Sequence, residues 1–243
     1  MPQGAALIVG AGDATGGAIA KAFAREGLVA CVSRRPRNLV SLNELVAQIE
    51  AEGCKARAFG VDAREEEATA ALVDQIEAEV GPLEVCVFNI GANVRFGITE
   101  TTSRVYQKVW EMAAYSGFLA GREAARVMRP RGRGTIIFTG ATAGVRGREG
   151  FSAFAGAKHA LRALAQSMAR ELGPEGIHVA HVVIDGPINS QFIRENVPDA
   201  ADRFAKDGLL LPDEIAKNYV WLHRQHRSAW THELDLRPWS ESW

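Results

Sequence analysis

The sequence predicts an α/β protein built on one doubly wound parallel sheet. Short apolar runs alternate along the chain with longer segments of helical spacing, which is the order of a parallel sheet joined by helices. The apolar runs are hydrophobic throughout rather than at every second residue, as strands are when helices cover both faces. No repeat, low-complexity segment or linker interrupts this order, so residues 1–243 are expected to form a single domain.

The first half of the chain supplies four of the expected strands. Ala5–Val9 is a short apolar run, and the segment G-A-G-D-A-T-G-G at 10–17 joins it to a helix. Val29–Ser33 is the second strand, and the basic segment R-R-P-R follows it directly. The later elements are a helix over Leu39–Glu52, a strand over Lys55–Val61, a helix over Glu65–Val80 and a strand over Val85–Phe88.

The second half is organised around the stretch Thr139–Leu172. This stretch begins T-G-A-T-A-G after a strand over Gly134–Phe138, and it ends in a long helix over Ser152–Leu172. Asn189–Leu211 carries few pattern signals and is predicted to be a mobile segment with one short helix. The other elements are a helix over Arg104–Met128, a strand over Ile177–Ile184, a helix over Asp213–His223 and a last strand over Glu233–Leu236.

Composition narrows the classes of protein. The chain is 47% hydrophobic and 23% charged with a formal net charge of -1, which indicates neither a nucleic-acid partner nor an anionic membrane. Its three cysteines are widely spaced, and the N-terminus lacks the basic and apolar regions of a signal peptide, so a reduced, cytoplasmic protein is expected. The histidines show no paired metal spacing, and we expect no metal.

The glycine-rich turn indicates a nucleotide site. Gly10, Gly12 and Gly16 follow the first strand and open the first helix, where glycine lets a pyrophosphate approach the helix amides. The alternative is a turn that needs glycine for geometry alone, and the strand–helix context favours the nucleotide. Asp13 would repel a pyrophosphate unless its carboxylate caps the helix or points outward. Thr15 belongs to the same expected site.

The end of the second strand bears on which nucleotide binds. An NAD site usually has an acid at this position to hold the ribose hydroxyls. This chain has Ser33 followed by Arg34, and hydroxyl and guanidinium groups suit the 2′-phosphate of NADP(H). A solvated basic loop is the alternative, and the residues alone leave the two open.

Lys158 lies on the long, mostly apolar helix over Ser152–Leu172, one turn after Phe154 on the same face. Burying an unpaired ammonium is expensive, so such a lysine either reaches solvent or finds a partner inside the protein. Taken alone, the position favours the solvent-reaching lysine.

With these pieces in place, the chain resembles the short-chain dehydrogenase/reductase family over nearly its whole length. Gly10 and Gly16 match the first and last glycines of the Gly-x-x-x-Gly-x-Gly turn, N-I-G at 89–91 resembles Asn-Ala-Gly, and Lys158 matches the lysine of Tyr-x-x-x-Lys. Asp62 matches the acid near the adenine, and D-G-P-I-N-S at 185–190 resembles the Pro-Gly-x-x-x-Thr segment over the nicotinamide. The resemblance implies a Rossmann-type fold and an oxidoreductase.

The resemblance also implies the site residues. Lys158 would hydrogen bond the nicotinamide ribose and is the one catalytic position that is retained. NADP is expected as the cofactor, with NAD the less favoured choice. The expected cofactor-binding residues are Gly10, Gly12, Asp13, Thr15, Gly16, Ser33, Arg34, Asp62, Ala63, Asn89, Gly91, Lys158, Gly186, Ile188 and Ser190.

The departures from the family fall where the chemistry should be. Phe154 replaces the tyrosine, Ala141 the serine and Ala113 the asparagine, and the tyrosine position of the family's enoyl reductases is Phe151. This pattern resembles an atypical subgroup with an incomplete glycine motif and Phe in place of Tyr. Substitute donors are conceivable, although each is more readily structural or solvent-facing; they are Thr142, Tyr115, Ser152, Asn93 and Arg95.

Two functions follow from this pattern. The first is an oxidoreductase that uses NADP(H) on an apolar small molecule with a non-standard proton source. The second is a catalytically inactive nucleotide-binding protein kept for sensing or assembly. A homodimer or homotetramer is expected in either case, because the two long helices carry more apolar surface than one sheet face covers. Aromatic residues near the end of the chain were expected to add an exposed partner surface; they are Trp230, Trp239 and Trp243.

Overall fold

A computed structural model describes residues 4–241 of the chain, and it contains one seven-stranded sheet. Every neighbouring pair of strands is parallel, in the order β3-β2-β1-β4-β5-β6-β7. The predicted doubly wound parallel sheet is therefore confirmed. The strands are β1 (Ala5–Val9), β2 (Val29–Arg34), β3 (Ala56–Gly60), β4 (Leu83–Phe88), β5 (Gly134–Thr139), β6 (Ile177–Ile184) and β7 (Glu233–Leu236).

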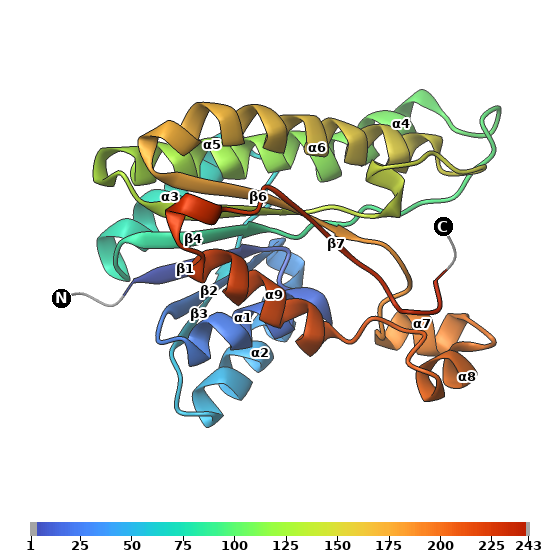
Figure 1. Cartoon of the computed structure of the whole chain (residues 1–243), viewed down its shortest axis with the longest axis horizontal. Coiled ribbons are helices and arrows are strands. Elements are labelled where there is room, and N and C mark those ends of the chain that lie inside the picture. The colour runs from blue at the N-terminus through green and yellow to red at the C-terminus, as the bar shows by residue number, and fades with distance from the viewer. Residues whose placement is uncertain (1–3, 242–243) are drawn as a thin grey trace.

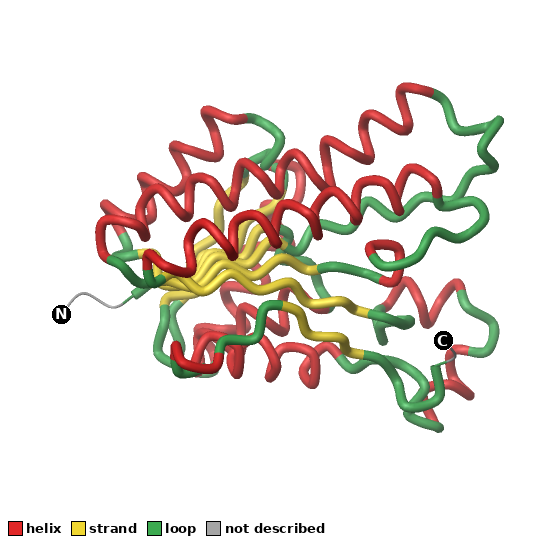
Figure 2. Tube along the Cα trace, turned by 45° about the horizontal axis from the view of Figure 1, so that its top comes forward, coloured by secondary structure: helices red, strands yellow, loops and turns green. Residues whose placement is uncertain are grey.

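Helices cover both faces of this sheet (Figures 1 and 2). One face packs against α1 (Thr15–Arg25), α2 (Leu39–Ala51) and α9 (Pro212–Arg224). The other face packs against α3 (Glu66–Glu79), α5 (Ser116–Met128) and α6 (Ser152–Leu172), and α4 (Ser103–Trp110) extends the line of α5.

The central strands are mostly apolar because each one contributes side chains to two cores. In β1, Ile8 belongs to the core under α1, α2 and α9, whereas Leu7 belongs to the core under α3, α5 and α6. Successive side chains of a strand point to opposite faces, so a strand covered on both sides needs apolar residues at every position. This is the physical reason for the hydrophobic runs in the sequence.

The strand order reverses between β1 and β4. The chain winds outward from β1 through β2 to β3, and then returns past β1 to β4 and continues to β7. At such a switch point the loops after the two central strands separate and leave a crevice at their carboxyl ends, where ligands of open α/β sheets bind.

Two predicted segments differ in detail from the structure. The helix expected over Arg104–Met128 runs without a break from α4 to α5, but Glu111–Tyr115 between them is a π-helical turn. The segment after β6 holds two short helices, α7 (Gln191–Asn196) and α8 (Ala200–Ala205), so the prediction of one was wrong. Such short helices depend on local caps more than on periodicity: Ser190 Oγ accepts a hydrogen bond from the Ile193 amide to begin α7.

Figure 1 shows α7 and α8 as a small lobe beside the carboxyl end of the sheet. Their amphipathic pattern is too short for a periodicity argument to detect. Across residues 4–241, the helices are each too short or too polar to span a bilayer.

Candidate functional site

A cavity of about 220 Å³ opens at the carboxyl ends of β1, β2, β3 and β4, at the switch point of the sheet. The glycine-rich turn forms one wall, and the segments that follow β2, β3 and β4 form the others. The cavity brings together these residues of the expected cofactor site: Gly10, Gly12, Ser33, Arg34, Asp62, Ala63, Asn89 and Gly91.

The glycines of the turn have distinct steric roles. Gly10 has φ +94°, and a Cβ there would lie 2.7 Å from the Asn89 carbonyl oxygen. A Cβ on Gly16 would lie 2.4 Å from the Gly10 carbonyl oxygen, whereas one on Gly12 would meet nothing within 4 Å. Gly10 and Gly16 are therefore required for packing, and Gly12 leaves open space beside the cavity.

The first turn of α1 is open to an anion. The residue before the helix, Ala14, has no side chain that can cap the free amides, and no acidic residue lies in the first turn. Thr15 is buried, and its hydroxyl has no partner among the described residues. Asp13 is exposed and does not line the cavity, which agrees with a carboxylate that points outward.

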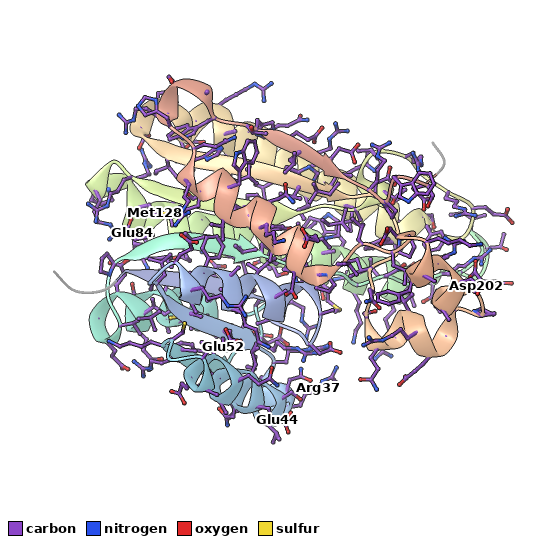
Figure 3. All side chains as sticks on the ribbon, turned by 60° about the horizontal axis from the view of Figure 1, so that its bottom comes forward. Arg37, Glu44, Glu52, Glu84, Met128 and Asp202 are labelled. Carbon is purple, nitrogen blue, oxygen red and sulfur yellow. The ribbon has the colours of Figure 1, made fainter. Side chains whose placement is uncertain are left out.

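The end of β2 is cationic. Ser33 is buried and lines the cavity together with Arg34 and Arg35. Burial, followed by the guanidinium of Arg37, lowers the pKa of Arg35. Figure 3 shows Arg37 at the outer edge of the molecule beside α2. An anionic group in this part of the cavity would relieve the mutual repulsion of the arginines.

Asp62 is held by a residue that the sequence reasoning missed. Arg64 Nε donates to Asp62 Oδ1 at 2.9 Å and Arg64 Nη2 donates to Oδ2 at 2.5 Å. The hydrogen bond from Arg64 is the main cause that lowers the pKa of Asp62, so this carboxylate is ionised and fixed in orientation. The only signal for this pair in the sequence was the spacing D-A-R at 62–64. Arg64 also lines the cavity.

Lys158 lies inside the protein. It is 2% exposed, and its Nζ donates to the Ile90 carbonyl oxygen at 2.9 Å and to the Thr139 carbonyl oxygen at 2.8 Å. The lysine thus connects the carboxyl ends of β4 and β5, and the solvent-reaching alternative was wrong. Burial lowers its pKa to about 7 because desolvation disfavours the charged amine.

The three positions that have lost polar groups share one apolar cluster. Phe154 of α6, Ala141 after β5 and Ala113 of the π-helical turn pack together, and Phe151 lies against them. The structure therefore brings the replaced positions to one place, next to the buried lysine one turn along α6. This surface offers shape and apolar contact but no proton.

Most of the conceivable substitute donors are committed elsewhere. Tyr115 stacks between Trp110 and Phe118, at centroid distances of 5.9 and 6.3 Å, on the outer side of α4 and α5. Arg95 is exposed, and its guanidinium lies 5.9 Å from the centre of the Phe151 ring. Asn93 is exposed, and the buried hydroxyl of Ser152 has no partner among the described residues.

Thr142 is bound to an acid that sequence reasoning also missed. Its hydroxyl donates to Asp185 Oδ1 at 2.7 Å, and Arg146 Nη2 lies 3.2 Å from the same oxygen. Asp185 is 2% exposed, and Arg237 Nη2 approaches its other oxygen at 3.8 Å. The carboxylate thus joins the end of β6 to three other segments. The available signal in the sequence was Asp185 itself, an acid at the position where the family's Pro-Gly-x-x-x-Thr segment has proline.

Seven of the expected cofactor residues do not line the cavity; they are Asp13, Thr15, Gly16, Lys158 and, in the segment from β6 to α7, Gly186, Ile188 and Ser190. Gly186 has φ +153°, and a Cβ there would lie 2.7 Å from Pro238. Ile188 forms a parallel bridge with Leu210, and Ser190 caps α7. Their part in cofactor binding stays a prediction.

A second buried group lies beneath α6. His181 of β6 is fully buried, and its Nδ1 lies 3.0 Å from Glu233 Oε2, while Arg162 binds Glu233 through both nitrogens at 2.5 and 2.7 Å. Burial lowers the pKa of His181 to about 4, so its ring is neutral. Within residues 4–241, no three histidine, cysteine or acidic side chains are grouped to hold a metal ion.

Comparison with known proteins agrees with this geometry. A family model described as short chain dehydrogenase matches residues 4–201. A short-chain dehydrogenase/reductase of Armillaria gallica is 31% identical over 186 residues, which cover 76% of this chain and 71% of the relative. The crystal structure of a short-chain dehydrogenase from Rhodopseudomonas palustris is 47% identical, with a TM-score of 0.83 over 97% of this chain and 99% of that one.

A more distant structure shares the fold alone. A metagenomic short-chain oxidoreductase in complex with NADP is 22% identical, with a TM-score of 0.78 over 97% of each chain. The match of the family model over most of the sequence, together with the 31% identical relative, establishes the relationship. This chain therefore belongs to the short-chain dehydrogenase/reductase family.

Proposed function

We propose that this protein is an oxidoreductase that binds NADP(H) and transfers hydride to or from an apolar small molecule. The observation that carries the proposal is the cavity at the switch point, where the glycine turn, the uncapped first turn of α1 and the cationic end of β2 meet. Residues 1–243 would act as one domain. The apolar cluster around Phe154 would receive the reacting part of the substrate.

The residues present fit a dinucleotide. Gly10, Gly12 and the amides of α1 would hold the pyrophosphate, and Asp62 with Ala63 would contact the adenine. Lys158 would lie against the nicotinamide ribose with one N–H left to donate to a ligand, because two of its three N–H groups are already fixed by backbone carbonyls. When bound, the nicotinamide supplies or accepts the hydride. Gly186, Ile188 and Ser190 would close over it.

The preference for NADP(H) over NAD(H) rests on the end of β2. Ser33 and Arg34 stand where an acid would hold the ribose hydroxyls, and Arg35 and Arg64 add positive charge to the same wall. A 2′-phosphate would pair with these guanidinium groups. The metagenomic relative solved with NADP supports this choice by analogy only.

The second function, a non-catalytic nucleotide-binding protein, is favoured by the joint replacement at Phe154, Ala141 and Ala113. Against it stands Lys158, which is fully buried at an energetic cost although the tyrosine that it would serve is absent. We therefore place the oxidoreductase first.

A homodimer or homotetramer belongs to the same proposal. Trp110 and Phe118 are 42% and 38% exposed, and together with Tyr115 they form a stacked row along α4 and α5. A row of exposed rings on two aligned helices suits a copy of the same surface. The tail contributes less than predicted, because Trp230 stacks on His178 instead of being exposed, Trp239 is exposed and Trp243 lies outside the described residues.

The experiment has two stages. Calorimetric titration with NADPH and NADH tests cofactor binding, and NADPH oxidation is then followed with a panel of aldehydes, ketones and quinones. The oxidoreductase predicts tight NADPH binding and turnover on a restricted part of the panel. Tight binding with no turnover on any probe would support the non-catalytic function instead, and no binding of either cofactor would overturn both.

A further inference from the structure

We propose that Lys158 is itself the proton donor to the substrate oxygen, in the place that the missing tyrosyl hydroxyl has left. This inference rests on the proposed oxidoreductase function and names the group that completes its reaction. The same lysine would act in reverse as the proton acceptor when an alcohol is oxidised.

The first argument is the position of the amine. Phe154 lies one turn before Lys158 on the same face of α6, so the ring that replaces the tyrosine is the lysine's immediate neighbour along the helix. The Nζ is held by the carbonyl oxygens of Ile90 and Thr139, at the carboxyl ends of β4, which borders the crevice, and of β5 beside it. Among the described residues its third N–H has no protein partner, so one donor remains for a ligand.

The second argument is the lack of competitors at the cluster. Ala141 and Ala113 carry no donor, the Thr142 hydroxyl is bound to Asp185, and Tyr115 is stacked on the outer side of its helix. The Ser152 hydroxyl is buried and has no partner among the described residues, but it has no acidity near neutral pH, so Lys158 is the ionisable group beside the apolar surface. A general acid must be within reach of the reacting oxygen before its pKa matters.

The third argument is the charge around the amine. From β6 it faces His181, which is neutral, and one turn later on α6 lies Arg162, which is cationic. Glu233 of β7 is bound by both Arg162 and His181 and is not available to the lysine. Across residues 4–241 no carboxylate is paired with Lys158.

These surroundings stabilise the neutral form of the Lys158 amine relative to the same form of a solvent-exposed lysine. Burial lowers the pKa of Lys158 to about 7, so both protonation states are populated near neutral pH. A proton donor is most effective when its pKa lies near the working pH. An exposed lysine with its ordinary pKa would hold its proton too tightly to serve as an efficient acid.

The step balances as follows. The hydride of NADPH forms a bond to the carbonyl carbon, and the electron pair of the C=O π bond takes a proton from the Lys158 ammonium. The products are the alcohol, NADP+ and the neutral amine. The amine then regains a proton from solution after the product leaves, so the net reaction consumes one carbonyl, one NADPH and one proton.

The first test needs no substrate. The Cε and Nζ resonances of labelled lysines are followed by NMR between pH 5 and 11, and Lys158 is assigned by comparison with Lys158→Arg. We expect Lys158 to titrate near neutral pH, well below the other lysines. Those reference lysines are Lys21, Lys55, Lys108, Lys206 and Lys217. A midpoint for Lys158 above about pH 9, within the usual range of lysines, would overturn the inference.

The second test uses turnover on the carbonyl probe that the unmutated protein reduces fastest. Lys158→Arg keeps the positive charge and hydrogen bonds but cannot release a proton, so we expect it to retain NADPH binding and lose at least about 100-fold in kcat. Lys217→Arg, at an exposed ion pair with Glu214 on α9, is the matched control and should be unchanged. Full turnover by Lys158→Arg would overturn the inference.

The pH profile separates a donor from a group that only positions the ribose. If Lys158 donates the proton, kcat for reduction falls about tenfold per pH unit above its midpoint. A kcat that stays level across that midpoint, with the lysine titrating there by NMR, overturns the donor role alone. No NADPH oxidation on any probe overturns the oxidoreductase proposal and the donor role together.

Discussion

The two ends of the candidate site differ in chemistry although the same sheet carries both. At the cofactor end, the cavity after β1 to β4 is lined by glycines, Ser33 and several arginines. At the reaction end, beside α6, the surface is built from Phe154, Ala141 and Ala113. Binding a dinucleotide uses backbone amides and charges distributed over many residues, whereas proton transfer depends on one or two side chains. Substitutions at a few positions can therefore remove the usual proton donor without altering the residues that line the cofactor cavity.

Most of the charged groups near the reaction end are paired with one another. Asp185 holds Thr142 and Arg146, and Glu233 holds His181 and Arg162. At the cofactor end, by contrast, burial and then the guanidinium of Arg37 lower the pKa of Arg35. The ion pairs near the reaction end are balanced within the protein, whereas Arg34 and Arg35 at the cofactor end are not paired in this way with any described residue.

The largest expected effect comes from restoring the polar groups at the reaction end. Phe154→Tyr combined with Ala141→Ser would bring a proton donor and an oxyanion donor to one oxygen, and should raise the rate on simple ketones by about 10²-fold or more. Phe154→Tyr alone should raise it little. NADPH oxidation by the two variants and the unmutated protein measures the difference.

The control for this experiment is folding. A buried tyrosyl hydroxyl without a partner costs about 1–3 kcal/mol, so the unfolding midpoint of each variant is compared first. If the double variant is folded and binds NADPH but is no faster than the unmutated protein, the two absent hydroxyl groups do not by themselves account for the low rate. Because Phe154, Ala141 and Ala113 replace the usual polar groups, we expect little ordinary carbonyl reductase activity from the unmutated protein. Robust ketone reduction by it, undiminished by Thr142→Ala or Tyr115→Phe, would contradict this expectation.

The next effect concerns the cofactor end. Arg34→Asp places a carboxylate where NAD sites hold the ribose hydroxyls, and it repels a 2′-phosphate. We expect the ratio of NADPH to NADH affinity to fall by about tenfold or more, equivalent to about 1.4 kcal/mol. Titration calorimetry with both cofactors measures the ratio. Equal affinities in the unmutated protein would sink the assignment of NADP(H).

A smaller effect is expected on assembly, which neither end of the site controls directly. The stacked row on α4 and α5 predicts a dimer or tetramer at micromolar concentration. Phe118→Asp should shift the equilibrium toward monomer, because Phe118 is 38% exposed and its ring closes the row. Light scattering reports the mass, and Trp221→Asp on α9, also exposed, serves as the control. A monomeric unmutated protein would end this proposal.

The smallest effect is the pH dependence of stability. The pKa of Lys158 is lowered in the folded state, so above pH 7 the unfolded chain binds more protons and the free energy of unfolding rises with pH. Between pH 7 and 8.5 this gain is on the order of 1–2 kcal/mol. The histidines with lowered pKa values contribute mainly below pH 7. Burial raises the pKa of the Cys31 and Cys86 thiols to about 12, which opposes the gain toward pH 8.5, so the contribution of Lys158 is the difference from a variant without it.

Urea unfolding at the two pH values measures this gain, and Lys158→Met should remove it. A slope that is the same in both proteins would indicate that Lys158 keeps its ordinary pKa. That result would also remove one support from its role as proton donor.

The sequence predicts those parts of the fold that depend on residues close together in the chain. The strands follow from apolar runs, and the need for Gly16 follows from its contact with the Gly10 carbonyl in the same turn, whereas the contact of Gly10 with Asn89 comes from a distant strand end. The sequence identified Lys158 as a candidate site residue. It did not by itself show that the lysine is buried, because the two carbonyl oxygens that accept its hydrogen bonds lie at strand ends far away in the sequence. Sequence reasoning had favoured the solvent-reaching lysine until the family resemblance was considered.

The ion pairs of the site were the hardest to predict. Asp185 meets Thr142 and Arg146 from some forty positions away in the chain, and Arg162 meets Glu233 across α6 and β7. No periodicity connects such residues. The separation between a cofactor end rich in charge and an apolar reaction end was visible in the sequence, because the residues of each end lie within recognisable motifs.

The central claim is that the cofactor end binds NADP(H) and that the reaction end has no proton donor other than Lys158. The structure of the complex with NADPH tests this claim most directly. The account predicts the 2′-phosphate against Ser33 and Arg34, and the C4 edge of the nicotinamide facing the apolar surface of Phe154 and Ala141. Lys158 should be the nearest protein group with an ionisable proton. A histidine, aspartate or tyrosine side chain standing within hydrogen-bond distance of the substrate position would contradict it, because the reaction end would then have its own acid.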